Sequence, residues 1–333
     1  MALIALGTVS VAQDRLRLLS YSDLQNWNED NHQAALKPFL ETCPKLKGIE
    51  WRKVCSIAEE IPNARLFFET FFYPILIENE EPALFTGYFE PELRGSLQRT
   101  SRFKHPIYAP PPKLPKDKPW LSRAQIEQTD VLAGRGLELA WIDEPIDAFF
   151  LHIQGSGRVQ FQDGETIRLG YKSENGHPYR SIGKELVRQN ILQKHEVSVN
   201  RIRSWARNNP KQAKRLMWHN PSYVFFRIIE ELPEKKGPLG AMNRSITAMR
   251  SLAIDPRYVK LGAPVWMEKA GPRPLNRLMI AQDTGAAIKG PQRADIFFGT
   301  GDDAGIAAGL TKDTGRLVVL LPIKLALDKV SGF

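Results

Sequence analysis

Acidic residues at the ends of apolar runs are the first candidates for chemistry in this sequence. Asp283 follows LMIAQ, Asp295 precedes IFFGTG, and Asp255 ends SLAI before a proline. Nearby glycines would let the backbone approach a ligand closely, and a carboxyl at a strand end can be shielded from bulk water. A shielded carboxyl can act as a general acid or base. Acids that cap turns in a glycine-rich barrel would explain the same residues.

Three known motifs fail to describe this glycine-rich segment. A phosphate loop needs a Ser or Thr directly after its Gly-Lys pair, whereas Lys289 precedes a glycine here. A calcium loop needs alternating oxygen ligands and a distal Glu, which GTGDDAG lacks. The triplet DTG of aspartic proteases needs a second copy, and the sequence has none. Because the histidines show no metal-ligand spacing, we expect no metal and no cofactor.

Two other clusters could hold a polar ligand. FTGYFE contains Thr86, Gly87 and Tyr88, and the Tyr88 ring could stack on a sugar or a base. The cluster QGSG offers hydrogen bonds from Gln154, Gly155 and Ser156 at what reads as a hairpin turn. Core aromatic residues and an ordinary turn account for both clusters equally well. His152 alternates with apolar neighbours, which favours a core histidine over a metal ligand.

The elements that position these residues follow from hydrophobic periodicity. Residues 14–70 read as helical, and residues 84–90 alternate as a strand that ends at Pro91. The Pro- and Lys-rich residues 97–120 predict a domain crossing. Hairpin strands are expected within residues 125–180, helices over 180–232, and short strands with glycine turns from about 237 onward. The pattern predicts a mixed fold.

Length and charge bound the function without deciding it. A chain of 333 residues suggests two domains, and a net charge of +9 indicates an acidic partner. Residues 180–215 hold ten Lys/Arg and two Glu. They lack the interleaved aromatic residues of a single-strand nucleic-acid surface, so a solvated helical face explains them. The apolar residues 1–12 are too short to span a membrane, and either the tail of a secretory signal or a buried strand fits them.

Cys43 and Cys55 lie on two predicted helical segments joined by a bend. A disulfide and two buried free thiols are equally compatible with this spacing. No histidine neighbours either residue, so a catalytic cysteine is not expected.

Seven long motifs give the sequence a family resemblance. They occur in one order over residues 80–322 and are FTGYFEPE, DAFFLHIQGSGRVQFQDG, GHPYRSIGKEL, NPSYVFFR, RSLAIDPRYVKLGAPVW, AQDTGAAIKGPQRADIFFGTGDDAGIAAG and GRLVVLLP. The chain resembles the membrane-bound lytic murein transglycosylase A family. The resemblance implies a mainly β, α+β fold with peripheral helices. A double-psi β-barrel, residues 1–97 plus 239–333, is interrupted by an inserted, β-barrel-like substrate domain, residues 98–238.

The resemblance also implies an activity and a site. The enzyme would cleave the β-1,4 bond between N-acetylmuramic acid and N-acetylglucosamine in peptidoglycan and form 1,6-anhydromuramic acid products. Asp295 would be acid and then base, with Asp283 and, less directly, Asp255 in support. Burial beside residues 296–298 and repulsion from Asp283 would raise the pKa of Asp295. The residues expected to hold the glycan are Thr86, Gly87, Tyr88, Gln154, Gly155, Ser156, Lys289, Gly299 and Gly301.

The expected partner is a peptidoglycan glycan strand and not nucleic acid. The expected setting is a periplasmic monomer, with peripheral attachment to the outer membrane left open. The chain departs from the family in lacking an N-terminal cysteine for a lipid anchor, in carrying Ala286 for a second glycine, and in one extra residue between Asp283 and Asp295, at Pro291. Two alternatives remain: an inverting hydrolase using Asp295 as acid and Asp283 as base, and a non-catalytic glycan- or anionic-polymer-binding protein.

Overall fold

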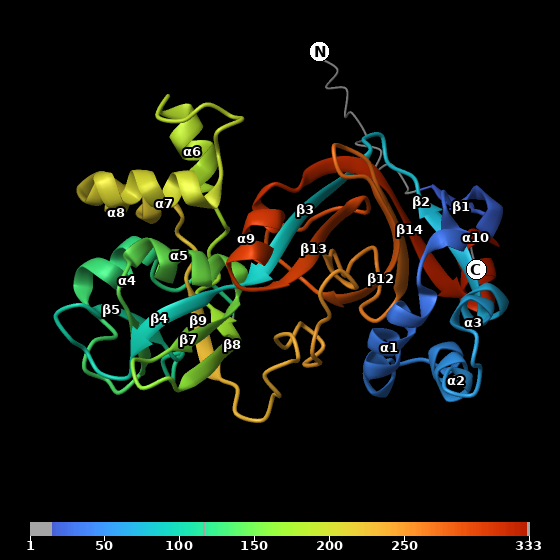
Figure 1. Cartoon of the computed structure of the whole chain (residues 1–333), viewed down its shortest axis with the longest axis horizontal. Helices are drawn as coiled ribbons and strands as arrows, with labels where there is room; N and C mark the ends of the chain where they lie inside the picture. Colours follow the sequence, from blue (N-terminus) through green and yellow to red (C-terminus); the bar gives the residue numbers. More distant parts are fainter. Residues whose placement is uncertain (1–14, 116, 332–333) are drawn as a thin grey trace, which may run out of the picture.

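Two β-rich units lie side by side in the computed structural model, which describes residues 15–115 and 117–331 (Figure 1). The apolar residues 1–12, for which we kept two interpretations, lie outside this part. The unit on the right of Figure 1 contains both the N-terminal helices and the C-terminal strands. The unit on the left is inserted between strand β3 (Ala83–Glu90) and strand β10 (Ser251–Ile254).

A closed barrel forms the centre of the first unit. Its sheet has the order β1-β2-β14-β11-β12-β10-β13-β3, and β14 also pairs with β3. The last six strands of this order therefore form a ring, with parallel pairs β10–β12 and β13–β3. The bounds are β1 (Leu16–Leu18), β2 (Phe72–Ile77), β3 (Ala83–Glu90), β10 (Ser251–Ile254), β11 (Pro264–Lys269), β12 (Leu275–Asp283), β13 (Arg293–Thr300) and β14 (Lys312–Pro322).

Helices cover the barrel and bury its apolar surface. The N-terminal ones are η1 (Tyr21–Asp23), η2 (Trp27–Glu29), α1 (His32–Thr42), η3 (Cys43–Lys45), α2 (Ile49–Ile57) and α3 (Ala64–Phe71), followed late in the chain by α9 (Asp302–Gly309) and α10 (Ile323–Ser331). The core contains the fully buried Trp51, Phe68 and Trp266. Cys43 and Cys55 are bonded, with Cα atoms 5.6 Å apart, so the disulfide alternative is confirmed.

The inserted unit is a second sheet, in the order β5-β6-β4-β7-β8-β9. Its strands are β4 (Glu92–Ser96), β5 (His105–Tyr108), β6 (Glu138–Ile142), β7 (Ser156–Gln160), β8 (Thr166–Glu174) and β9 (Val224–Ile228). Helices α4 (Arg123–Thr129), α5 (Pro145–Gln154), α6 (Ile182–Arg188), α7 (Val199–Asn208) and α8 (Pro210–His219) accompany it. Within the described residues no hydrogen-bonded pair of edge strands closes this sheet.

Four local expectations differ from the structure. Strand β4 pairs with β6 and β7, so the second sheet begins just after Pro91 and not after residue 97. Residues 97–120 are accordingly no crossing, because they contain β5 of the same sheet. Residues 145–154 form helix α5 and not a strand, since Pro145 starts the helix and Gly155 (φ 75°) ends it. Residues 224–228, expected to be helical, form β9.

Buried charge fastens the two units together where the chain crosses between them. Glu90, at the end of β3, is fully buried. Its carboxylate lies 3.0 Å from Arg158 Nε and 3.1 Å from Arg168 Nε, and it accepts a 2.8 Å hydrogen bond from Thr300. Both arginines also donate to backbone carbonyls of the returning crossover, at Glu234 among others. The outward and returning crossings are therefore held by one network.

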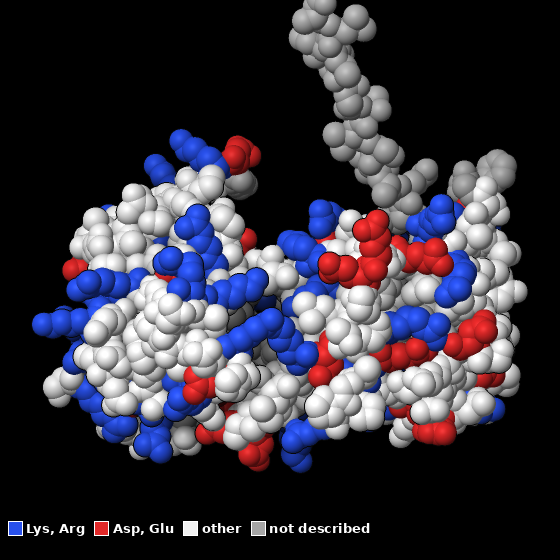
Figure 2. All heavy atoms as spheres, turned by 90° about the horizontal axis from the view of Figure 1, so that it is seen from above, with Lys and Arg blue, Asp and Glu red and all other residues white. Residues whose placement is uncertain are grey.

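The surface of the inserted unit is strongly basic. Seen from above in Figure 2, Lys and Arg gather over this unit, whereas acidic residues are more frequent over the barrel. Several arginines of residues 180–215 pair with nearby acids at the surface, as in Arg188–Glu185 and Arg201–Glu196. This pairing supports the interpretation of the segment as a solvated helical face. Within residues 15–115 and 117–331, no helix is long and apolar enough to cross a membrane.

Candidate active site

Strand register brings two of the predicted acids into one row across the barrel. Asp283 on β12 pairs with Ala253 on β10, Ala253 pairs with Asp295 on β13, and Asp295 pairs with Thr86 on β3. Side chains of directly paired residues share one face of a sheet. A bulge between Leu252 and Ala253 in the β10–β12 register sets Asp283 opposite Ala253. Ala253, which lies between the two acids in this row, has only a small side chain.

Asp295 is held by a short chain of hydrogen bonds. Thr86 Oγ1 donates to Asp295 Oδ1 at 2.5 Å, and Arg293 Nη2 donates to Thr86 Oγ1 at 2.7 Å. Burial raises the pKa of Asp295, while the Thr86 hydrogen bond and the Arg293 charge act in the opposite direction. The net shift favours the protonated carboxyl and makes Asp295 a better proton donor near neutral pH.

Asp283 is held by three donors. Its Oδ1 accepts the N–H groups of Ala241 at 3.0 Å and Thr284 at 2.9 Å, and its Oδ2 accepts the hydroxyl of Tyr88 at 2.9 Å. Burial raises its pKa to about 6 against these hydrogen bonds, with added repulsion from Asp295. The pKa of Tyr88 is raised well above its ordinary value, mainly by burial, so its hydroxyl keeps its proton. These contacts fix the direction of the Asp283 carboxyl.

Asp255 serves a different purpose from the other two acids. It is buried and accepts hydrogen bonds from the Arg257 guanidinium and, at 2.8 Å, from the Gly290 N–H. The hydrogen bond from Arg257 lowers the pKa of Asp255 well below its ordinary range. A permanently ionised, paired carboxylate is a poor proton donor. Asp255 instead anchors the 284–292 loop that connects the strands of the other two acids.

The apolar wall of the site differs from the one expected from sequence. Phe297 faces the site and lies 5.3 Å from the Tyr88 ring, in a cluster with Ala253. Ile296 and Phe298 alternate to the opposite face and join the barrel core instead. Of the three residues 296–298 expected to line the site, only Phe297 does so.

The predicted glycan-binding residues fall into three groups. Thr86 and Tyr88 face the acids, as described above. Gly87 points the other way, because a Cβ there would lie 2.6 Å from Ala308 and the Phe298 ring, so it allows α9 to pack on β3. Gly299 and Gly301 have φ of 113° and 88°, and the Gly301 N–H already donates to the Glu90 carbonyl. The conformation of both glycines is therefore structural.

The remaining predicted residues lie where the inserted unit meets the barrel. Gln154 Oε1, at the end of α5, accepts the Phe89 N–H of β3 at 3.0 Å. Gly155 ends α5, and the buried Ser156 begins β7. Lys289 is exposed and lies close enough to Glu174 of β8 to oppose the rise that burial causes in the pKa of Glu174. The acids therefore lie beside an interdomain boundary with polar groups on both sides.

Sequence reasoning missed three residues of this site. Arg293 reaches Asp295 only through Thr86, Ala253 matters through its small size, and Glu174 comes from the other domain. The first two lie inside motifs that the sequence singled out, but nothing local distinguishes them. His152 is a core residue as expected, buried and 3.0 Å from Arg123. Among the residues that the structure describes, no cluster of His, Cys, Asp or Glu could hold a metal ion.

A closed barrel, an inserted sheet and a pair of partly buried carboxyls on the barrel strands β12 and β13 define a two-domain protein with a candidate acid–base site. Comparisons with known proteins identify the family to which this two-domain chain is similar. Residues 84–227 match the MltA specific insert domain, and residues 250–321 match the 3D domain.

Two curated relatives have the same name. The chain is 36% identical over 245 residues to membrane-bound lytic murein transglycosylase A of Vibrio cholerae, covering 70% of this chain and 64% of the relative. It is 35% identical over 261 residues to the protein of that name from Escherichia coli K12, covering 74% and 68%. The chain belongs to the membrane-bound lytic murein transglycosylase A family.

Solved structures extend the similarity over nearly the whole chain. A membrane-bound lytic murein transglycosylase from Agrobacterium tumefaciens is similar with a TM-score of 0.83 at 30% identity, covering 95% of this chain and 99% of that one. Escherichia coli MltA with bound chitohexaose gives a TM-score of 0.72 at 27% identity, covering 92% and 94%.

Proposed function

We propose that this protein is a lytic transglycosylase. It cleaves the β-1,4 bond between N-acetylmuramic acid and N-acetylglucosamine in peptidoglycan and leaves a 1,6-anhydromuramic acid end. The observation that carries the proposal is the partly buried carboxyl of Asp295, whose pKa burial raises, on a strand within the matched 3D domain. The relative with bound chitohexaose, an oligosaccharide, supports a glycan as the ligand of this fold.

One carboxyl is sufficient for this reaction. Protonated Asp295 donates its proton to the glycosidic oxygen as the bond to C1 of the muramic acid breaks. The resulting carboxylate takes the proton of the C6 hydroxyl of the same sugar, and the C6 oxygen forms the new bond to C1. Asp295 ends protonated again, so acid and base are the same residue. General acid–base catalysis of this kind contributes roughly 10²–10⁴ in rate.

Asp283 acts as a positioning residue in this scheme. Two backbone N–H groups and the Tyr88 hydroxyl already occupy its carboxyl oxygens. A general base that activates water would have to break one of these contacts or use the remaining lone pairs. Its negative charge is instead suited to stabilise positive charge that develops on the sugar ring. This favours the single-acid mechanism over the inverting hydrolase.

Groups on both sides of the interdomain boundary would hold the glycan. Lys289 offers a positive charge for the lactyl or stem-peptide carboxylates of murein, and Glu174 across the boundary accepts hydrogen bonds from sugar hydroxyls. Gln154 links the end of α5 to β3 and sets the distance between the walls. Ser156 and the site-facing Thr86 complete the polar lining.

The products of murein digestion test the proposal. Wild-type protein should release muropeptides that are one water lighter than those of a hydrolase, as mass spectrometry resolves. Asp295→Asn should abolish release while preserving binding to murein sacculi. Asp303→Asn is the matched control, because Asp303 is exposed in the same glycine-rich segment. Release of only reducing muramic acid ends would establish the hydrolase, and undiminished lysis by Asp295→Asn would remove Asp295 from the mechanism.

We infer that the protein works as a monomer in the compartment that holds murein, with peripheral attachment to the outer membrane. The name of its relatives, which are membrane-bound and act on murein, supports the location and the attachment to a membrane. Cell fractionation and size-exclusion chromatography test location and oligomeric state. Recovery in the cytoplasmic fraction, or elution as a dimer, would contradict the inference.

A further inference from the structure

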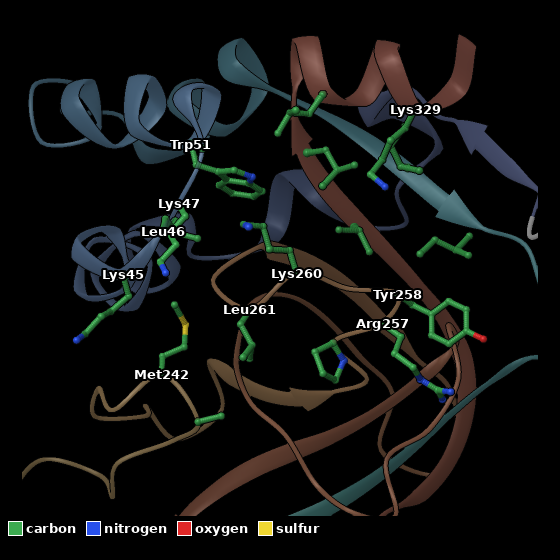
Figure 3. Close-up of a pocket in the computed structure, with 18 of the residues that line it drawn as sticks. Lys45, Leu46, Lys47, Trp51, Met242, Arg257, Tyr258, Lys260, Leu261 and Lys329 are labelled. Carbon is green, nitrogen blue, oxygen red and sulfur yellow. The ribbon is translucent and has the colours of Figure 1, made fainter. Parts of the chain in front are cut away.

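A cavity of about 1120 Å³ lies on the barrel between helix α2, helix α10 and the turn after β10 (Figure 3). Asp283, Asp295 and Thr86 do not line it. Its volume slightly exceeds the roughly 300–1,000 Å³ of ordinary small-molecule sites. We call this cavity the cationic pocket, for the residues described below.

The inner surface of the cationic pocket is apolar. It is formed by side chains from several elements of the barrel unit, namely Leu46, Trp51, Ile75, Val319, Leu321 and Leu325. Contact with these groups stabilises a ligand only if the ligand is itself apolar, because a polar ligand would lose hydrogen bonds to water without replacement. The inner surface therefore suits a hydrocarbon chain.

The rim of the pocket is positively charged. Lys45 and Lys47 come from the loop before α2, Lys260 from the turn after β10, and Lys329 from α10. All four lysines are exposed, and no acidic residue lines the pocket. In Figure 3, Lys45 and Lys47 lie on one side, Lys329 on the other, and Lys260 between them. A fifth cation, Arg257, is already paired with Asp255.

A disulfide holds one wall of the pocket in place. Lys45, Lys47 and Trp51 all lie within the loop that the Cys43–Cys55 bond closes. On the facing wall, Gly262 (φ 90°) packs so closely that a Cβ there would lie 2.5 Å from Leu46. A wall that is ordered before binding spares the ligand the cost of ordering it.

We propose that the cationic pocket binds an anionic lipid, with the acyl chain on the apolar surface and the phosphate of the headgroup at the lysine rim. Charge complementarity selects the headgroup, because the described lining has basic residues and no acid to balance them. The apolar interior selects a lipid over the stem peptides of murein, whose carboxylates would satisfy the rim but leave the interior without a partner. The proposal stands independently of the lytic activity.

Binding of lysophosphatidylglycerol below its critical micelle concentration tests this proposal. Isothermal titration of the full chain should show one site. The dissociation constant should fall roughly tenfold for every two buried methylenes added to the chain. Lysophosphatidylcholine of equal length and glycerol phosphate without a chain should each bind at least about tenfold more weakly. The choline cation of the first cancels the charge of its phosphate and is repelled by the lysine rim, and the second has no acyl chain for the apolar surface.

Charge-reversal variants test whether the lipid binds in the cationic pocket. The triple variant Lys45→Glu, Lys47→Glu, Lys260→Glu should weaken binding by at least about tenfold. The control Lys113→Glu, Lys184→Glu, Lys211→Glu changes net charge equally at exposed lysines of the inserted unit and should bind as wild type does. Leu261→Trp, which fills part of the pocket while all four rim lysines are kept, should also weaken binding, with folding verified by circular dichroism.

Four results would overturn the proposal. The first is that lysophosphatidylglycerol does not bind, and the second is that glycerol phosphate binds as tightly as lysophosphatidylglycerol. The third is that the pocket triple variant and the control triple variant weaken lipid binding equally. The fourth is that a soluble muropeptide binds to wild type and no longer binds to the pocket triple variant. The last would make the pocket an extension of the murein site. Because Ala241 lines the pocket and also donates its N–H to Asp283, murein lysis is measured on the same variants. Lysis unchanged by the triple variant supports a separate lipid site.

Discussion

Replacing Thr86 with valine should move the pH at which activity is lost. The hydroxyl of Thr86 is the hydrogen-bond donor to Asp295 Oδ1, and valine keeps the shape of the side chain but removes that donor. Arg293 stays in place, because its Nη1 also donates to the carbonyls of Leu84 at 3.2 Å and Ala294 at 2.6 Å. The substitution therefore removes one contact of the carboxylate, together with the hydrogen bond that Arg293 Nη2 donates to Thr86 Oγ1.

The size of the shift follows from the strength of that contact. A hydrogen bond to a charged group contributes about 1.5–3 kcal/mol, and one pKa unit corresponds to about 1.36 kcal/mol. The bond stabilises the ionised form of Asp295, so its loss raises the pKa further, by about 1–2 units. The other groups that face this carboxyl are Arg293, Tyr88 and Asp283, and all of them remain.

The assay is kcat/KM for a defined glycan strand as a function of pH. Activity requires protonated Asp295, so it falls as the pH rises through the apparent pKa of the Asp283–Asp295 pair. In Thr86→Val this alkaline limb should move up by about 1–2 units. The matched control is Thr300→Val, which also removes a threonine hydroxyl, on the neighbouring strand β13. That hydroxyl donates to Glu90 and not to Asp295, so the limb should stay in place. An unmoved or lowered limb in Thr86→Val would refute the assignment of Asp295 as the acid.

Three stability predictions follow from contacts away from the reacting atoms. Cys43→Ala with Cys55→Ala should cost about 3 kcal/mol in urea unfolding, because the bond closes a loop with a sequence separation of 12; equal stability would show that the bond constrains little. Glu90→Gln should cost about 3–5 kcal/mol by removing the charge that pairs with the buried Arg168 and the partly buried Arg158, whereas Glu92→Gln, at an exposed carboxyl, should cost under about 1 kcal/mol. The lowered pKa of Asp255 adds stability that is present above its unfolded pKa of about 3.9 and is lost as pH falls through the folded value. Wild type should therefore lose stability below about pH 4–5 more steeply than Asp255→Asn, and parallel curves would contradict the pairing with Arg257.

Local sequence patterns predicted much of the framework of the site. Strands β10 and β12 deliver Asp255 and Asp283 at the ends of apolar runs, as periodicity indicated. The same patterns misassigned helix α5, because a continuous apolar run such as DAFFLHI suits a buried helix as well as a buried strand. The pair Cys43 and Cys55 likewise stayed ambiguous, since sequence separation says nothing about the direction of two side chains.

The sequence by itself determined the family, the order of the two β units and the acids available for chemistry. These are properties of residue type and of neighbours along the chain. Only the tertiary structure decided which acids meet: Asp283 and Asp295 share a row through Ala253, whereas Asp255 is turned toward Arg257 and the Gly290 loop. It also decided that Thr86, 209 residues away, donates to Asp295. Strand register and a bulge determine which of these side chains come together, and both depend on pairing between segments far apart in the chain.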